Sequence, residues 1–168
     1  MRRIAEKVGI TPMAIYRHFP DKDALLNALM LDGFAAWEAR IRSLTATEPL
    51  HWLEQLGETF LEFALSEPRR YEAAFLLKAS AARRYPQDFA AGRSPVIRMA
   101  HERIEQARAQ GLLVDASAME IGLAISALCQ GFVSMYQAGR FVDETEFRAA
   151  FRQAQRRCLQ SFTKGAGK

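Results

Sequence analysis

Three residues near the start of the chain have the chemistry to bind a polyanion. Tyr16 and Lys22 offer a hydroxyl and an ammonium group, which bind phosphate oxygens whatever the base sequence. Arg17 carries a guanidinium, which can donate to both O6 and N7 of guanine. Lys22 follows a helix-capping Asp21, and a cation in the first turn of a helix opposes the helix dipole, a conflict that a nearby phosphate would resolve. The alternative is that Tyr16 packs in a core and that both cations are solvated.

Two short predicted helices joined by a tight turn position these residues. Residues 2–8 have the periodicity of an amphipathic helix, and Gly9 can adopt the positive φ that ends it. Thr11 is a good N-cap and Pro12 a good first residue for a second helix over 12–18. This arrangement lets the second helix enter the major groove of DNA.

A longer string of residues gives this helix pair a family resemblance. The string runs Ile4-Ala5-Glu6-Lys7-Val8-Gly9-Ile10-Thr11, then Ile15-Tyr16-Arg17-His18-Phe19, then Lys22 followed by Ala24-Leu25-Leu26. It resembles the DNA-binding signature of the tetracycline-repressor (TetR) family of transcriptional regulators. The resemblance implies an all-α fold, with a helix-turn-helix head at residues 1–27 and a helical effector-binding and dimerisation bundle at residues 28–168.

The resemblance also implies roles for single residues of the head. Phosphate contacts would come from Thr11, Tyr16, His18 and Lys22, and base contacts from Pro12, Met13, Ala14 and Arg17. The function it implies is a ligand-responsive repressor, which a small molecule releases from an inverted-repeat operator in double-stranded DNA.

The chain departs from the family pattern at its first residue. The family has an amphipathic helix of about twenty residues ahead of this motif, whereas this sequence starts at Met1, inside the motif. We therefore expect Ile4, Val8, Ile15 and Phe19 to lose part of their cover, which costs on the order of 1–2 kcal/mol for each side chain left half exposed. Either the start is misplaced or truncated, or the chain is a headless dimer that binds a small molecule without touching DNA.

The remainder of the chain is predicted to be helical. Strand signals are nearly absent, and prolines and glycines stand where helices should begin and end. Residues 83–94 are predicted to be a loop with some helical turn. The predicted helices beyond the head cover residues 22–43, 49–66, 69–81, 95–110, 116–138 and 144–163.

The last two of these helices predict a homodimer. The helix over 116–138 is apolar on almost every side, with interleaved small residues that allow close helix approach, so it needs burial on several sides. Residues 121–139 carry no charge and are long enough to span a bilayer, but their serines, glutamines and glycines favour burial in protein. Pairing with symmetry mates would give a four-helix interface, as the family resemblance also implies, and a charge at Phe151 would then disrupt the dimer. The predicted interface residues are Leu128, Phe132, Met135, Phe147, Phe151, Cys158 and Phe162.

Aromatic residues in the middle of the chain predict a cavity for an apolar or aromatic effector. Aromatic side chains at helical spacing are often only core, but here methionine and histidine residues accompany them. Glu58 and Glu62, one turn apart, are expected to form a solvated face. The predicted pocket residues are Trp52, Phe60, Phe63, Phe75, Met99, His101, Phe132 and Tyr136.

No enzyme signature is found in the sequence. It has no glycine-rich phosphate loop, no nucleophile elbow and no paired carboxylates, and its three histidines lack metal-ligand spacing, so we expect no catalytic residue, metal or cofactor. Two cysteines are too few for a disulfide framework, and no signal peptide precedes the motif, which favours a cytoplasmic protein. The net charge of +4 permits a polyanionic partner without requiring one.

Overall fold

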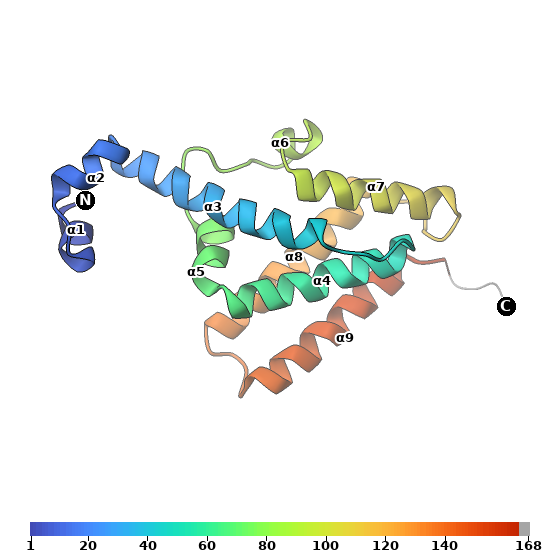
Figure 1. The fold of residues 1–168 in the computed structure, drawn as a ribbon. Coiled ribbons are helices and arrows are strands. Elements are labelled where there is room, and N and C mark those ends of the chain that lie inside the picture. Colours follow the sequence, from blue (N-terminus) through green and yellow to red (C-terminus); the bar gives the residue numbers. More distant parts are fainter. Residues whose placement is uncertain (165–168) are drawn as a thin grey trace. The chain divides into compact units, whose positions relative to one another are not determined.

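The computed structural model describes residues 1–164, and in that range the chain is helical, with one isolated β-bridge between Leu113 and Thr163 (Figure 1). This confirms the all-α fold class. The elements in chain order are α1 (Arg2–Val8), α2 (Pro12–His18), α3 (Lys22–Arg42), α4 (Pro49–Ser66), α5 (Pro68–Tyr71), the π-helix η1 (Glu72–Leu76), α6 (Gln87–Ala90), α7 (Pro95–Ala109), α8 (Ala118–Gln137) and α9 (Glu144–Phe162).

Most predicted helix boundaries agree with the structure to within two residues, because their caps are local. Ser117 caps α8 by accepting a hydrogen bond from the Glu120 amide, while the Glu120 carboxylate accepts one from the Ser117 amide. One prediction is wrong: the helix expected over residues 69–81 ends at Leu76, after a π-helical turn. Residues 77–82 continue as a loop that other parts of the chain hold in place.

The chain forms two compact units, and the first comprises Met1–Ala36 together with Glu67–Ala82. In this unit α3 approaches α5 and η1 closely at Gly33, where a Cβ atom would lie 2.6 Å from the Arg70 carbonyl oxygen of α5 and 3.0 Å from the Ala74 Cβ of η1. The rings of Phe34 and Phe75 pack edge to face with centroids 5.7 Å apart. A segment from the middle of the sequence therefore shares a core with the first half of α3. The predicted division at residues 27 and 28 stays a prediction.

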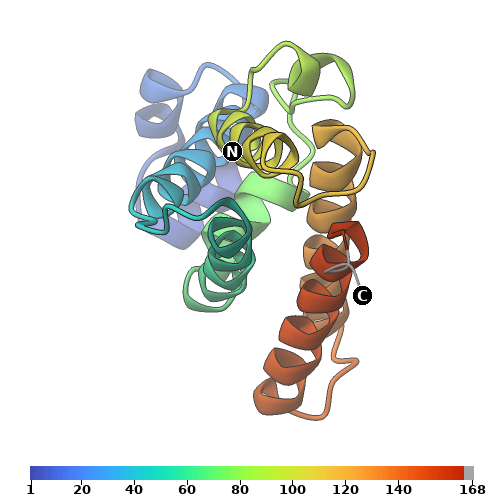
Figure 2. The same cartoon turned by 90° about the vertical axis from the view of Figure 1, so that its right-hand side faces the viewer.

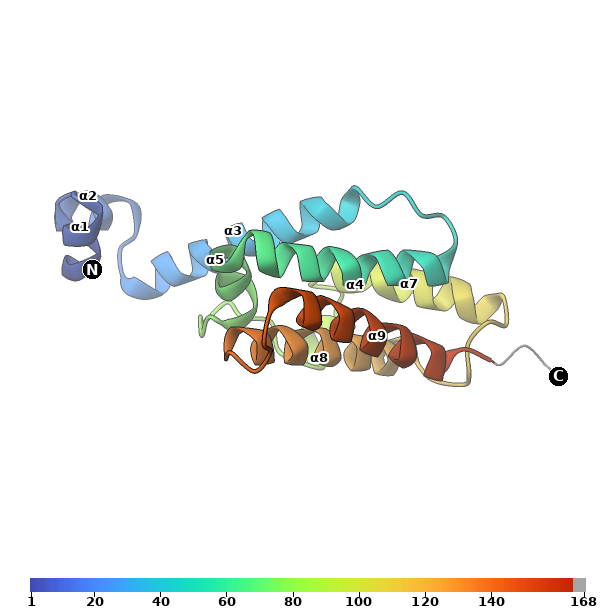
Figure 3. The ribbon, with the colours of Figure 1, turned by 90° about the horizontal axis from the view of Figure 1, so that it is seen from below.

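The second unit comprises Trp37–Ser66 and the described residues from Arg83 on. In it α4 packs against α7, α8 and α9, while α8 lies between α7 and α9 in contact with both. Figures 2 and 3 show α8 and α9 side by side as a hairpin. The core of this unit includes Trp37, which contacts Phe60 and Phe63 with ring centroids 5.6 Å away in both cases.

Helix α8 is only partly covered by its own chain. Among the described residues it is the one helix whose length and hydropathy suffice to cross a membrane, and 33% of its apolar window is buried. Its buried face includes Ile121, Ile125 and Cys129, and Gly122 lets the His101 ring of α7 approach to within 3.3 Å of where a Cβ would be. The predicted burial of this helix on several sides therefore needs a second chain, and its pairing with a symmetry mate stays a prediction.

Candidate nucleic-acid interface

The turn between α1 and α2 has the geometry that its sequence predicts. Gly9 ends α1 with a φ of 75°, in the left-handed region that glycine adopts without strain. The Thr11 hydroxyl oxygen accepts a hydrogen bond from the Ala14 amide at 3.2 Å and so caps α2. Ala5 and Ile15 are buried, which fixes the two helices against each other.

Helix α2 presents the side chains predicted to contact DNA to solvent. Met13 is 71% exposed and Tyr16 47% exposed, and Arg17 and His18 are exposed as well. Tyr16 therefore does not pack in a core, which removes the alternative interpretation of that residue. Pro12 and Ala14 are half-buried on the same short helix. Six of the eight residues predicted to contact DNA thus lie on α2. The other two are Thr11, which caps α2, and Lys22, which begins α3.

The start of α3 places a cation beside α2. Asp21 caps this helix by accepting a hydrogen bond from the Ala24 amide at 2.7 Å, and Lys22 begins it with an exposed side chain. Lys22 forms no ion pair with any residue in the described range. The next carboxylate, Asp23, is held instead by Ser80 and Asn27, and the hydrogen bond from Ser80 lowers the pKa of Asp23. Lys22 thus remains available to an external anion.

The apolar side chains expected to lose cover in the head do so unevenly. Ile4 is 40% and Val8 64% exposed, as predicted. Ile15, in contrast, is buried at 7% exposure, and Phe19 is half-buried. The prediction for Ile15 was therefore wrong: the residue lies on α2, which packs against α1.

The residues predicted to line an effector pocket divide into core and half-buried positions. Trp52, Phe60 and Phe63 are buried in the core of the second unit, while Met99, Phe132 and Tyr136 are half-buried. Phe75 belongs to the first unit, where it packs on Phe34. His101 packs against Gly122, and burial lowers the pKa of its imidazole. Trp52, Phe60 and Phe63 thus act as core packing in this chain, while an effector site at the others remains a prediction.

The residues predicted to form a dimer face also divide. Phe147 and Phe151 are fully buried within the chain, so they offer no surface to a partner, and the prediction for these two is wrong. Their rings pack with those of other aromatic residues: Tyr136 stacks on Phe147 with centroids 4.3 Å apart, and Phe132 meets Phe151 edge to face at 6.0 Å. The remaining members are partly accessible: Met135 is exposed, and Leu128, Phe132, Cys158 and Phe162 are half-buried.

Sequence reasoning missed a ladder of ion pairs between α4 and α9. Arg148 pairs with Glu62 and Glu144, and Arg152 forms a two-oxygen ion pair with Glu58. Hydrogen bonds that the arginines donate to the carboxylates raise the pKa of both arginines, and the bond from Arg152 lowers the pKa of Glu58. Glu58 and Glu62 are thus not a solvated face. The matching four-residue spacing of the arginines on α9 was the available signal.

The described residues contain no group of three or more histidine, cysteine or acidic side chains that could hold a metal ion.

Comparisons with known proteins agree with this architecture. Residues 1–29 match the family model described as bacterial regulatory proteins, tetR family, and residues 53–158 match the one described as tetracyclin repressor-like, C-terminal domain. No curated protein matches the chain. Among solved structures, one described as a protein with unknown function from Rhodococcus sp. RHA1 is similar with a TM-score of 0.71 and 23% identity, over 97% of this chain and 84% of that one. That similarity shows the fold.

Proposed function

This chain belongs to the TetR family of DNA-binding transcriptional regulators, and on that premise we propose that it is a cytoplasmic repressor that a small molecule releases from an inverted-repeat operator. The observation that carries this proposal is the exposed face of α2 beside the unpaired Lys22. A short helix with exposed Tyr16 and Arg17, packed by its other face on α1, has the form of a recognition helix in a major groove.

The proposal assigns different roles to Lys22 and Arg17. Lys22 would neutralise a phosphate, so Lys22→Ala should weaken binding to all sequences alike and reduce the salt dependence of binding by about one counterion. Arg17 would donate to a guanine edge, so Arg17→Ala should cost about 1–3 kcal/mol at one base pair and relax the preference there. Both side chains are exposed, so neither change should unfold the protein.

A salt titration on selected and random DNA tests these roles. The operator is first selected from a random DNA library with the unmodified protein, and Arg157→Ala, which removes an exposed cation of α9, serves as the charge control. An unchanged salt slope for Lys22→Ala, or equal weakening of selected and random DNA by Arg17→Ala, contradicts the assignment. Failure to select any sequence would favour the alternative of a dimer that binds a small molecule without touching DNA.

We propose further that two chains pair through the outer face of α8. Leu123, Ala127 and Gly131 follow one another at single-turn spacing, are exposed, and lie in a stretch without charge. A Cβ at Gly131 would meet no atom of its own chain within 4 Å, so a second helix could approach closely there. A dimer would bring two recognition helices to one operator, whose half-sites should lie about one helical turn apart.

A single charge on this face should prevent dimerisation and leave the fold intact. Ala127→Glu puts a carboxylate in the middle of the proposed interface, whereas in the single chain the position is exposed. Analytical ultracentrifugation should show a dimer for the unmodified chain and a folded monomer for the variant. A variant that remains dimeric places the interface elsewhere, and Gln153→Glu, on the exposed side of α9, controls for charge.

A further inference from the structure

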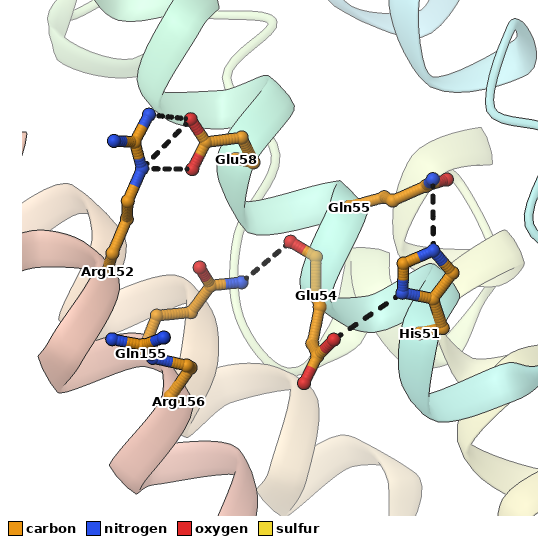
Figure 4. A pocket seen from close by; sticks show the side chains of 7 residues that line it. All are labelled: His51, Glu54, Gln55, Glu58, Arg152, Gln155 and Arg156. Carbon is orange, nitrogen blue, oxygen red and sulfur yellow. Dashed lines mark hydrogen bonds and ion pairs between the residues drawn. The ribbon is translucent and has the colours of Figure 1, made fainter.

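A small open cavity lined by polar and charged residues lies between α4 and α9, apart from the aromatic residues considered above (Figure 4). Its volume is about 250 Å³. The two helices can approach here because residue 57 is glycine: a Cβ at this position would lie 1.9 Å from the Gln155 amide nitrogen. Glycine thus makes room on α4 for the Gln155 side chain of α9.

Gln155 provides a fixed hydrogen-bond acceptor at the cavity. The residue is only 6% exposed, and its amide nitrogen donates to the backbone carbonyls of Leu53 at 3.3 Å and Glu54 at 3.0 Å. Two carbonyl partners fix the orientation of the amide, since a flipped group would set oxygen against oxygen. The amide oxygen has no hydrogen-bond partner within the described chain, and it points toward the Glu58–Arg152 pair (Figure 4). An accessible oxygen that has no partner in the described chain can accept a hydrogen bond from a molecule bound in the cavity.

The charges around the cavity balance. Arg152 and Glu58 neutralise each other in a two-oxygen ion pair. Two further charged groups have no such partner: Arg156 forms no ion pair with any described residue, and the half-exposed Glu54 carboxylate has only a 3.5 Å contact with His51. The site therefore presents one available guanidinium, one available carboxylate and one neutral acceptor.

We propose that this cavity binds a small zwitterion of the free α-amino acid class. The ligand carboxylate would pair with Arg156, and its ammonium group would donate to the Gln155 oxygen and to Glu54. An anion alone would meet Glu54 without compensation, and a cation alone would leave Arg156 unpaired. At about 250 Å³ the space lies below the range of drug-sized pockets, which fits a ligand of few atoms.

The test uses three probes of one size class on the full chain: alanine, alaninamide, which lacks the carboxylate, and N-acetylalanine, which lacks the ammonium group. Binding is followed by the side-chain amide resonance of Gln155 in ¹H–¹⁵N spectra. Alanine should bind with a dissociation constant of a few millimolar or below, and each analogue at least tenfold more weakly. No shift with alanine at about 50 mM, or equal binding of all three probes, overturns the proposal.

Two arginine variants distinguish a specific contact between Arg156 and the ligand carboxylate from a general effect of positive charge. Arg156→Gln should weaken alanine binding at least tenfold, because it removes the carboxylate partner. Arg157→Gln, the neighbouring exposed residue, should change it less than twofold. Equal effects of the two substitutions, or no effect of Arg156→Gln, overturn the proposed role. Neither result bears on DNA binding, so this inference stands or fails independently of the proposed function.

Discussion

Replacing Phe151 by glutamate should unfold the chain rather than only separate two chains. Phe151 is fully buried, and its ring packs against Phe132 and Phe147 with centroids 6.0 and 6.1 Å away. Removing a buried phenylalanine costs about 3–5 kcal/mol. A carboxyl group buried there would have a pKa raised from about 4.3 to about 8 or more, so keeping it in the folded state at pH 7 adds about 4 kcal/mol. The sum of about 7–9 kcal/mol is comparable with the whole stability of a typical domain.

The loss of stability that comes from burying the carboxyl group can be recognised by its pH dependence. The folded pKa of the new carboxyl group is raised, so its penalty is absent below the unfolded pKa of about 4.3 and grows as the pH rises. Glutamine has nearly the shape of glutamate but cannot ionise, so Phe151→Gln serves as the matched control. Urea unfolding followed by circular dichroism, at about pH 4.5 and pH 7 and at several protein concentrations, should show the two variants converging at the lower pH. A Phe151→Glu protein that is as stable as the unmodified chain at pH 7 would refute the core position of this residue.

Two further predictions concern the second unit. Gly57→Ala should lower the free energy of unfolding by about 1–3 kcal/mol, because it displaces a buried amide, whereas Gly131→Ala, which meets no atom, should not lower it in a monomeric background. Urea denaturation compares the two, and equal effects would refute the close approach of α4 and α9. Burial, assisted by the charge of Cys158, raises the pKa of the Cys129 thiol to about 12. Iodoacetamide at pH 8 should therefore alkylate Cys158 faster than Cys129, with equal rates in denaturant, as peptide mass spectrometry can measure.

The parts of the fold that depend on neighbouring residues could be predicted from the sequence. Thr11 and Asp21 cap helices through amides three residues away, and Gly9 acts within its own turn. The placement of the residues predicted to contact DNA is local in the same way, since one short helix and its flanks carry all of them, while their contacts with DNA stay a prediction. The end of η1 was not predictable in this way, because residues 77–82 are held by Asp23 and Asn27, more than fifty positions earlier.

The remaining predictions failed because they concern side chains whose partners lie far away in the sequence. The pairing of Arg148 and Arg152 with α4 joins residues 86 and 94 positions apart, a separation at which periodicity carries no information about contact. Phe147 and Phe151 belong to an apolar stripe that would look the same whether it faced the core or a second chain. The depth of burial of a stripe depends on which helices pack on it, and this is a tertiary property.

The shared core of Met1–Ala36 and Glu67–Ala82 has a consequence for building chimeric regulators. The polypeptide passes from one unit to the other three times, after Ala36, after Ser66 and after Ala82. A DNA-reading module cut at a single point after Ala36 would separate Gly33 from the Arg70–Ala74 backbone, against which only a residue without a side chain fits. A transplant to another body should therefore carry both segments, and a library of fusions joined at one crossover should yield fewer soluble proteins than one joined at all three.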